Sequence, residues 1–427
     1  PDDANQLRNL ERLLERQERW DDLASLLRER MSRMDAKGAR EARFTIVRMY
    51  LEKTRAYSEA LGEIRVLLGD REASSADLVA LLERIVAEND APDAAKREAI
   101  SLLRERYAAE ERTTDVVRTL DTALALADGG ERIALHAEAA ERLAQQGQLD
   151  EAMGHYAEVL RLAPSDETTR VRLRALADRG GAHARYVEIL VEIASATDDG
   201  ALRSRLRAEA AEVHHAVLGD VKSAIVLYNQ VLDEPMRGRE LALKTARSLA
   251  GLYEETGKRN SRLLMLETQA ELEEQTPARA AALRKVAEVA TELGEADRAL
   301  AAYRALIETT PEDQRVVAGM VALLEAESRW AELVTVLRQR SIAATGAWQT
   351  RADLVRIANI ESGPLDAPEA AIATWTEVAE RFGEDADVVD ALSGLFARES
   401  RFEELAGLLA RAADREGTHL AAVRVRL

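Results

Sequence analysis

Residues 149–164 read LDEAMGHYAEVLRLAP. Within this stretch the small residue Ala152 is followed four positions later by the aromatic Tyr156, and Pro164 closes the segment. A spacing of four places two side chains on the same face of an α-helix, and a proline cannot continue such a helix. The stretch therefore predicts a helix that turns one small and one aromatic residue toward a neighbouring helix.

The same spacing recurs along the chain, in Ala224 and Tyr228, Ala299 and Tyr303, and Ala371 and Trp375. Pro311 closes the unit that contains Tyr303, and Pro235 lies one residue early in the unit that contains Tyr228. This pattern resembles the second half of the tetratricopeptide repeat (TPR), an Ala-x3-aromatic pair with a closing proline. In the unit that ends at Pro164, the positions of the first half of the family motif are occupied by other residues. The resemblance implies helix hairpins stacked into a right-handed α-solenoid.

A short polar turn precedes the second helix of each expected hairpin. The residues that open these helices are Trp20, Tyr57, Thr113, Leu149, His183, Val221, Asn260, Ala296, Trp330, Pro368 and Phe402. Successive openers are 34 to 39 residues apart, except for the 56 residues between Tyr57 and Thr113. The surplus of 22 residues corresponds to about one additional helix and turn. The predicted fold is all-α, with about eleven TPR-like hairpins and one extra helix near residues 76–89.

The extra helix is expected to begin at a Ser75 cap and to run through Leu78, Leu81, Leu82 and Ile85, with Pro92 in the first turn of the next helix. We expect one continuous solenoid over residues 1–427. It consists of N-terminal repeats at 1–70, the extra-helix insertion at 71–92 and further repeats at 93–427. Both ends of the sequence fall within a repeat, which predicts that it is a segment of a longer array or chain. The extra helix either projects a spare face toward a partner, with a local break in curvature near residues 74–92, or is buried as a wedge.

The recurring aromatics are expected to be core spacers between stacked hairpins rather than a ligand cage. Eight of the 16 aromatic residues occupy these positions: Trp20, Tyr57, Tyr156, Tyr228, Tyr303, Trp330, Trp375 and Phe402.

The composition excludes several classes of function. The chain has no cysteine, which removes thiolate nucleophiles and Cys-ligated metals. Its net charge of −18 should repel a phosphate backbone, so nucleic-acid binding and an RNA-processing half-repeat protein are disfavoured. No stretch approaches the roughly 18 to 20 apolar residues of a membrane span. We expect a soluble protein, with the cytoplasm preferred over the periplasm, while the sequence assigns no oligomeric state.

Residues that could carry chemistry are scattered. The adjacent His214 and His215 point about 100° apart on a helix and cannot share a metal ion. The glycine pairs at 129–130 and 180–181 follow no strand and do not have the spacing of a phosphate loop. The sequence therefore predicts no catalytic residue, no cofactor and no metal site, and the chain is not expected to be an enzyme.

In the family, the first helix of each hairpin lines a concave face that binds extended peptides or helices of partner proteins. By register, the candidate partner-binding residues are Arg8, Arg12, Glu141, Gln145, Arg284, Glu288 and Glu292. The same register turns Glu15, Thr45, Met49, Glu52, Ser248, Leu252 and Glu255 inward. We therefore expect a non-enzymatic scaffold that binds proteins through its groove and edges. The alternative is the recruiting or regulatory arm of a larger enzyme whose catalytic domain lies outside this segment.

Overall fold

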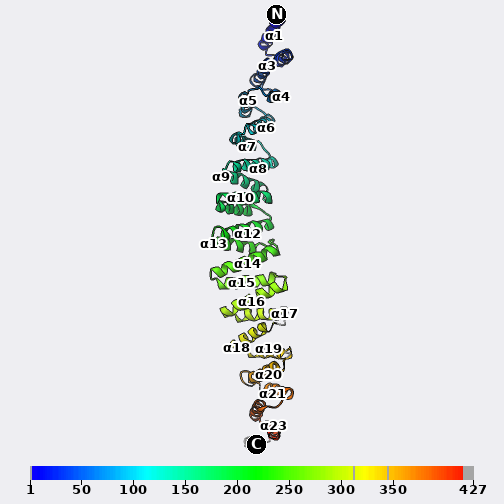
Figure 1. Cartoon of the computed structure of the whole chain (residues 1–427), viewed down its shortest axis with the longest axis vertical. Coiled ribbons are helices and arrows are strands. Elements are labelled where there is room, and N and C mark those ends of the chain that lie inside the picture. Colours follow the sequence, from blue (N-terminus) through cyan, green and yellow to red (C-terminus); the bar gives the residue numbers. More distant parts are fainter. Residues whose placement is uncertain (1, 311–312, 344–345, 417–427) are drawn as a thin grey trace. The chain divides into compact units, whose positions relative to one another are not determined.

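The computed structural model describes residues 2–310, 313–343 and 346–416 (Figure 1). These residues form 23 α-helices and one π-helical turn, and no strand occurs among them. The all-α prediction is therefore confirmed. The chain divides into two compact units, residues 1–227 and 228–427, with the boundary inside one helix.

The first unit begins with two hairpins and the extra helix: α1 (Asp2–Arg16) and α2 (Trp20–Met31), then α3 (Ala36–Met49), the π-helical turn η1 (Tyr50–Thr54) and α4 (Tyr57–Leu68), then α5 (Ser75–Ala87). It continues with α6 (Asp93–Ala109) and α7 (Thr113–Leu124), α8 (Gly129–Gln145) and α9 (Leu149–Leu162), α10 (Glu167–Gly180) and α11 (His183–Ala196), and α12 (Gly200–Ala216) and α13 (Val221–Asp233). The unit boundary falls within α13.

The second unit contains α14 (Arg239–Glu255) and α15 (Arg259–Leu272), α16 (Thr276–Leu293) and α17 (Ala296–Thr309), α18 (Gln314–Ala326) and α19 (Trp330–Ala343), α20 (Ala347–Ser362) and α21 (Pro368–Phe382), and α22 (Ala386–Arg398) and α23 (Phe402–Glu416). Helices pack on their neighbours in sequence order, as α8 does on α9 and α20 on α21. The described helices thus form a helical repeat array of eleven hairpins and one extra helix, as predicted. The handedness of the superhelix and the break in curvature stay predictions.

Every hairpin turn contains a residue with a left-handed backbone, two positions before the second helix begins. These residues are Gly147, Gly181, Gly219, Gly257 and Gly294 in five turns and Glu18, Arg55, Glu111, Ser328, Asp366 and Ser400 in the other six. Ten of the eleven predicted openers are the first residue of their helix, and the exception is α15, which begins at Arg259 rather than Asn260. The same backbone geometry therefore recurs in every described hairpin turn and sets the start of the second helix.

The small residues of the repeated pairs are fully buried, with no exposed surface at Ala152, Ala224, Ala299 and Ala371. The aromatic partners are buried at Tyr156, Tyr228 and Trp375, while Tyr303 is half-buried. The Tyr303 ring lies over Gly319 of the next hairpin, where an added Cβ would stand 3.0 Å from the ring. The aromatic of one unit thus packs against the first helix of the following unit.

The aromatics that open second helices are less buried than predicted. Tyr57 is buried, Trp20 and Trp330 are half-buried, and Phe402 is 63% exposed. The prediction that Phe402 is a core spacer is wrong. The first residue of a second helix lies next to the turn, at the edge of the hairpin, where half or more of a large ring can remain in water.

The extra helix α5 is part of the core. Its apolar residues Leu78, Leu82 and Ile85 are almost fully buried, and the helix packs mainly on α6 and also on α4. Ser74 caps it, since its hydroxyl accepts a hydrogen bond from the backbone N–H of Asp77 at 3.3 Å, so the predicted Ser75 cap is displaced by one residue. Pro92 is the N-cap of α6 rather than a residue of its first turn. Of the two expectations, the structure shows the buried wedge.

Candidate functional site

No group of three or more His, Asp or Glu side chains that could hold a metal ion is found in the described part of the chain. Within the same ranges, no helix is both long and apolar enough to cross a membrane.

The predicted partner-binding residues are all exposed, and they lie on three different first helices, α1, α8 and α16. Some of them already have partners. Arg284 pairs with Asp313 at 2.9 Å, and Glu141 pairs with Arg172 of the following hairpin. Gln145 follows Glu141 by one turn of α8, and Glu288 and Glu292 follow Arg284 at the same spacing on α16. Each helix therefore carries a small polar patch.

Two residues that the register turned inward lie in the core. Met49 is 7% exposed and Leu252 is 1% exposed. First helices contact both their hairpin partner and the neighbouring hairpin, so their buried face is wide, as the seven buried residues of α14 show. Ser248 is half-buried, whereas the described positions Glu15, Thr45, Glu52 and Glu255 are exposed.

One hollow lies between consecutive second helices, α21 and α23, with α22 beneath them. It has a volume of about 820 Å³, and we call it the acidic groove. It is lined by Thr376, Ala379, Glu380, Glu384, Leu392, Phe396, Glu403, Glu404, Gly407, Leu408 and Arg411. Leu392, Phe396 and Leu408 are buried residues and form an apolar floor.

Four carboxylates and one guanidinium border the acidic groove. Glu404 pairs with Arg401 at 2.7 Å, and this hydrogen bond holds the pKa of Glu404 below its ordinary value. Glu384 pairs with Arg411 at 3.1 Å. Glu380 and Glu403 form no ion pair with any described residue. The groove is therefore negatively charged around a hydrophobic base.

The second hollow, of about 510 Å³, lies between α9 and α11 in the first unit. His136 of α8 and His155 of α9 border it, and their Nδ1 atoms are 3.0 Å apart; we call these two residues the histidine pair. Arg161 bonds Glu192 at 2.8 and 3.0 Å and also pairs with Glu158, so two of the four glutamates that line this hollow are paired with an arginine. Sequence reasoning missed the pair because its members are 19 residues apart on two helices, outside any short metal-binding motif.

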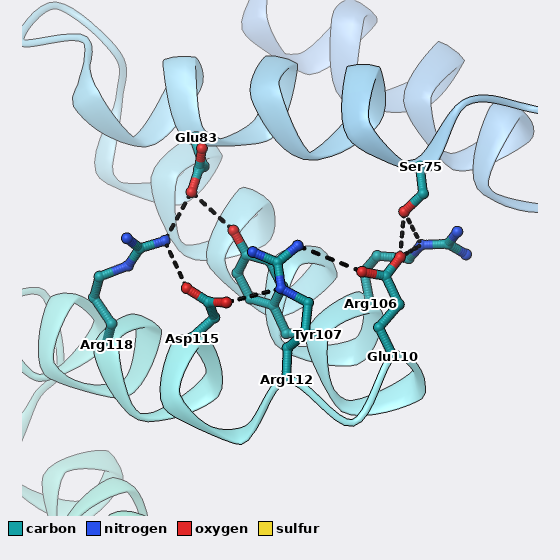
Figure 2. A network of polar contacts seen from close by, with 8 residues as sticks. All are labelled: Ser75, Glu83, Arg106, Tyr107, Glu110, Arg112, Asp115 and Arg118. Carbon is teal, nitrogen blue, oxygen red and sulfur yellow. Dashed lines mark hydrogen bonds and ion pairs between the residues drawn. The ribbon is translucent and has the colours of Figure 1, made fainter.

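A third arrangement surrounds the extra helix (Figure 2). Glu83 of α5 accepts hydrogen bonds from the Tyr107 hydroxyl of α6 at 2.8 Å and from Arg118 of α7 at 2.9 Å. Asp115 joins Arg118 at 3.1 Å to Arg112 at 2.8 Å. Burial and the neighbouring Glu83 raise the pKa of Tyr107, so its hydroxyl stays protonated as a donor.

The other end of this network is built on Ser75. Its hydroxyl contacts the Glu110 carboxylate and accepts a hydrogen bond from Arg106 Nε at 2.8 Å, while Arg106 and Glu110 pair at 2.9 Å (Figure 2). The Ser75 hydrogen bond holds the pKa of Glu110 below its ordinary value. The charged groups of this network bond one another across α5, α6 and α7, so the network ties the extra helix into the stack rather than presenting a reactive group.

The similarity of this chain to known proteins is limited to solved structures. No family model and no curated protein matches the chain. Among solved structures, that of Naa15/Naa10 bound to HypK-THB is 14% identical over 89% of this chain, with a TM-score of 0.31, and the chain spans 64% of its length. The TPR domain of P58(IPK) is 17% identical over 87% of this chain and 96% of its own, with a TM-score of 0.22. A tetratricopeptide repeat protein from Parabacteroides merdae is 14% identical over 62% of this chain and 99% of its own, with a TM-score of 0.26. Two of these three structures are named as tetratricopeptide repeats, the family that the sequence resembles.

Proposed function

We propose that the chain is a non-enzymatic scaffold that binds segments of partner proteins, and that the acidic groove is a principal contact site. The observation that carries the proposal is the combination of a hydrophobic base with two carboxylates, Glu380 and Glu403, that form no ion pair with a described side chain. Apolar anchors surrounded by polar rims are the usual arrangement of protein interfaces. A partner helix or extended segment with cationic and apolar side chains would neutralise the carboxylates and cover the base.

The exposed residues on first helices form the second surface of the proposal. Arg8, Arg12, Glu141, Gln145, Arg284, Glu288 and Glu292 remain candidates for contacts along the concave face. A net charge of −18 makes a nucleic acid a poor partner for either surface.

The test compares two double variants in the second unit. Glu380→Gln with Glu403→Gln neutralises the acidic groove, and Glu288→Gln with Glu292→Gln neutralises the same number of exposed carboxylates on a first helix. Each chain is used as bait, and the proteins captured by the wild-type chain are purified and their affinities measured. Two rim carboxylates contribute about 1 to 2 kcal/mol in total, so the groove variant should bind about 5- to 30-fold more weakly than the control.

Equal affinity of both variants for every captured protein would contradict a role for the groove. Loss of binding only in the first-helix variant would move the site to the concave face. If no purified protein bound the wild-type chain directly, the scaffold proposal itself would fail.

A further inference from the structure

We propose that the histidine pair is a binding site for a divalent transition-metal ion, with Zn²⁺ the preferred candidate, that links α8 to α9. Imidazole nitrogen is a common ligand of zinc, nickel and copper, whereas magnesium and calcium prefer oxygen. The inference is independent of the acidic groove and of the partner proteins proposed above.

The geometry of the two rings is close to that of a shared metal ion. The Nδ1 atoms of His136 and His155 are 3.0 Å apart, and the rings are tilted by 46° with centroids 5.2 Å apart. Two imidazoles bound to tetrahedral Zn²⁺ at about 2.0 to 2.1 Å have their ligating nitrogens about 3.3 Å from each other. A shared ion would therefore require the two nitrogens to separate by about 0.3 Å and both rings to turn until their lone pairs converge on it.

The hydrogen-bond pattern also leaves a position for a cation. Two Nδ1 atoms that face each other can bond only if exactly one of them carries a proton, and a metal ion would take the place of that proton. Asp121 Oδ1 lies 4.0 Å from His155 Nε2, beyond hydrogen-bond distance, and places a negative charge beside this ring.

The surroundings admit and favour a positive ion. His136 is 7% exposed, the side chain of His155 is 19% exposed, and the adjoining hollow has a volume sufficient for water ligands. Four glutamates line this hollow against two arginines, and one of them, Glu158, follows His155 by three residues on α9. Burial, followed by the effect of His155, holds the pKa of His136 below its ordinary value, so the imidazole is neutral at pH 7 and available as a ligand.

The experiment titrates the full chain with ZnCl₂ at pH 7.5 in a calorimeter and repeats the titration with His155→Gln, Asp121→Asn and His214→Gln. Wild type should bind one ion per chain through the histidine pair. His155→Gln should weaken binding at least tenfold, and Asp121→Asn, which removes a negative charge 4.0 Å from His155 Nε2, should weaken it by less. His214→Gln controls for binding to other histidines and should leave the constant unchanged.

Two further readouts separate a metal site from a structural histidine contact. Binding should raise the thermal midpoint of wild type but not of His155→Gln, because only a ligand of the folded state stabilises it. Co²⁺ should give the intense visible absorption of a four-coordinate ion, and this absorption should vanish in His155→Gln. Circular dichroism of each variant verifies that the fold is retained. Absence of binding at 1 mM Zn²⁺, or equal binding by wild type and His155→Gln, would overturn the proposal.

Discussion

The two hollows lie at equivalent places in the repeat, each between two consecutive second helices, yet their linings differ. Between α9 and α11 the hollow has a histidine pair, and Arg161 bonds two of its carboxylates. Between α21 and α23 it has an apolar floor and two carboxylates without an ion pair among the described residues. The stacked hairpins thus supply the same kind of depression in both units, and the side chains at its borders decide which ligand it suits.

The largest expected effect tests whether the aromatic residues next to the two hollows contribute equally to stability. Tyr156 of α9 and Trp375 of α21 hold the same repeat position, and each is 3% exposed. Tyr156→Ala and Trp375→Ala should each lower the free energy of unfolding by about 3 to 5 kcal/mol, the usual cost of removing a buried large aromatic. Urea unfolding measures the loss, with the exposed Arg284→Ala as a control expected to change stability by less than about 0.5 kcal/mol. A mild loss of stability at only one of the two positions would show that the two aromatic residues do not have the same structural role.

An intermediate effect is expected at Gly319, where the Tyr303 ring of the preceding unit lies close to the backbone. A Cβ at this position would stand 3.0 Å from the ring and 2.8 Å from its hydroxyl. Gly319→Ala should therefore cost about 1 to 3 kcal/mol despite the better helix propensity of alanine. Thermal unfolding measures the change, and Gly251→Ala, with open space around its Cβ, serves as the matched control. Equal stabilisation by both substitutions would show that Tyr303 does not pack there.

Acidification should destabilise the helices around the two hollows at different pH values. The pKa of His136 is lowered in the fold, so the unfolded chain takes up the proton more readily and stability falls as pH drops below the unfolded value of about 6.5. The pKa of Glu404 is also lowered, but its stabilisation persists until pH falls below the ordinary glutamate value of about 4.3. Hydrogen exchange at pH 5.5 should therefore increase in α8 and α9 before it increases in α23. His136→Gln should remove the first effect, and simultaneous loosening of both regions in wild type would contradict the contrast.

The smallest effects are expected in the turns that fix the spacing of the second helices. Ser328 has a left-handed backbone with φ of 55°, and Gly294 fills the corresponding place in the preceding hairpin with φ of 73°. Ser328→Gly should stabilise the second unit by up to about 1 kcal/mol, because glycine adopts this conformation without strain. Gly294→Ala should destabilise it by about 1 kcal/mol. Opposite signs in thermal unfolding are the expected result, and equal signs would show that the backbone angle does not limit stability.

The sequence was sufficient to predict the repeat frame because that frame depends on local patterns. Polar turns, helical periodicity and the pairs of Ala and aromatic residues located the second helices, and the 22-residue surplus located α5. The error at Phe402 has a different origin, since burial at the end of a helix depends on how neighbouring hairpins cover it. Met49 and Leu252 were misplaced because a first helix has two packing partners and hence a wide buried face.

The histidine pair and the network around α5 could not be predicted from spacing alone. His136 and His155 meet because α8 and α9 fold back on each other. To predict this contact, one must know which residues of α8 lie opposite which residues of α9, and residue spacing does not give that alignment. The network around α5 joins Glu83, Tyr107 and Arg118, which lie on three helices. The sequence predicted each helix but not how the three helices align with one another. The predicted first-helix residues are exposed, and their role in partner binding stays a prediction.

The most direct test of the central claim is hydrogen exchange of the full chain with and without a directly binding partner protein. We predict that binding slows exchange in residues 376–411, which border the acidic groove, and that Glu380→Gln with Glu403→Gln reduces this protection. Residues 151–192, around the histidine hollow, should keep their exchange rates and thereby serve as an internal control. Unchanged exchange in 376–411, with protection elsewhere in the chain, would contradict the assignment of the groove as the contact site.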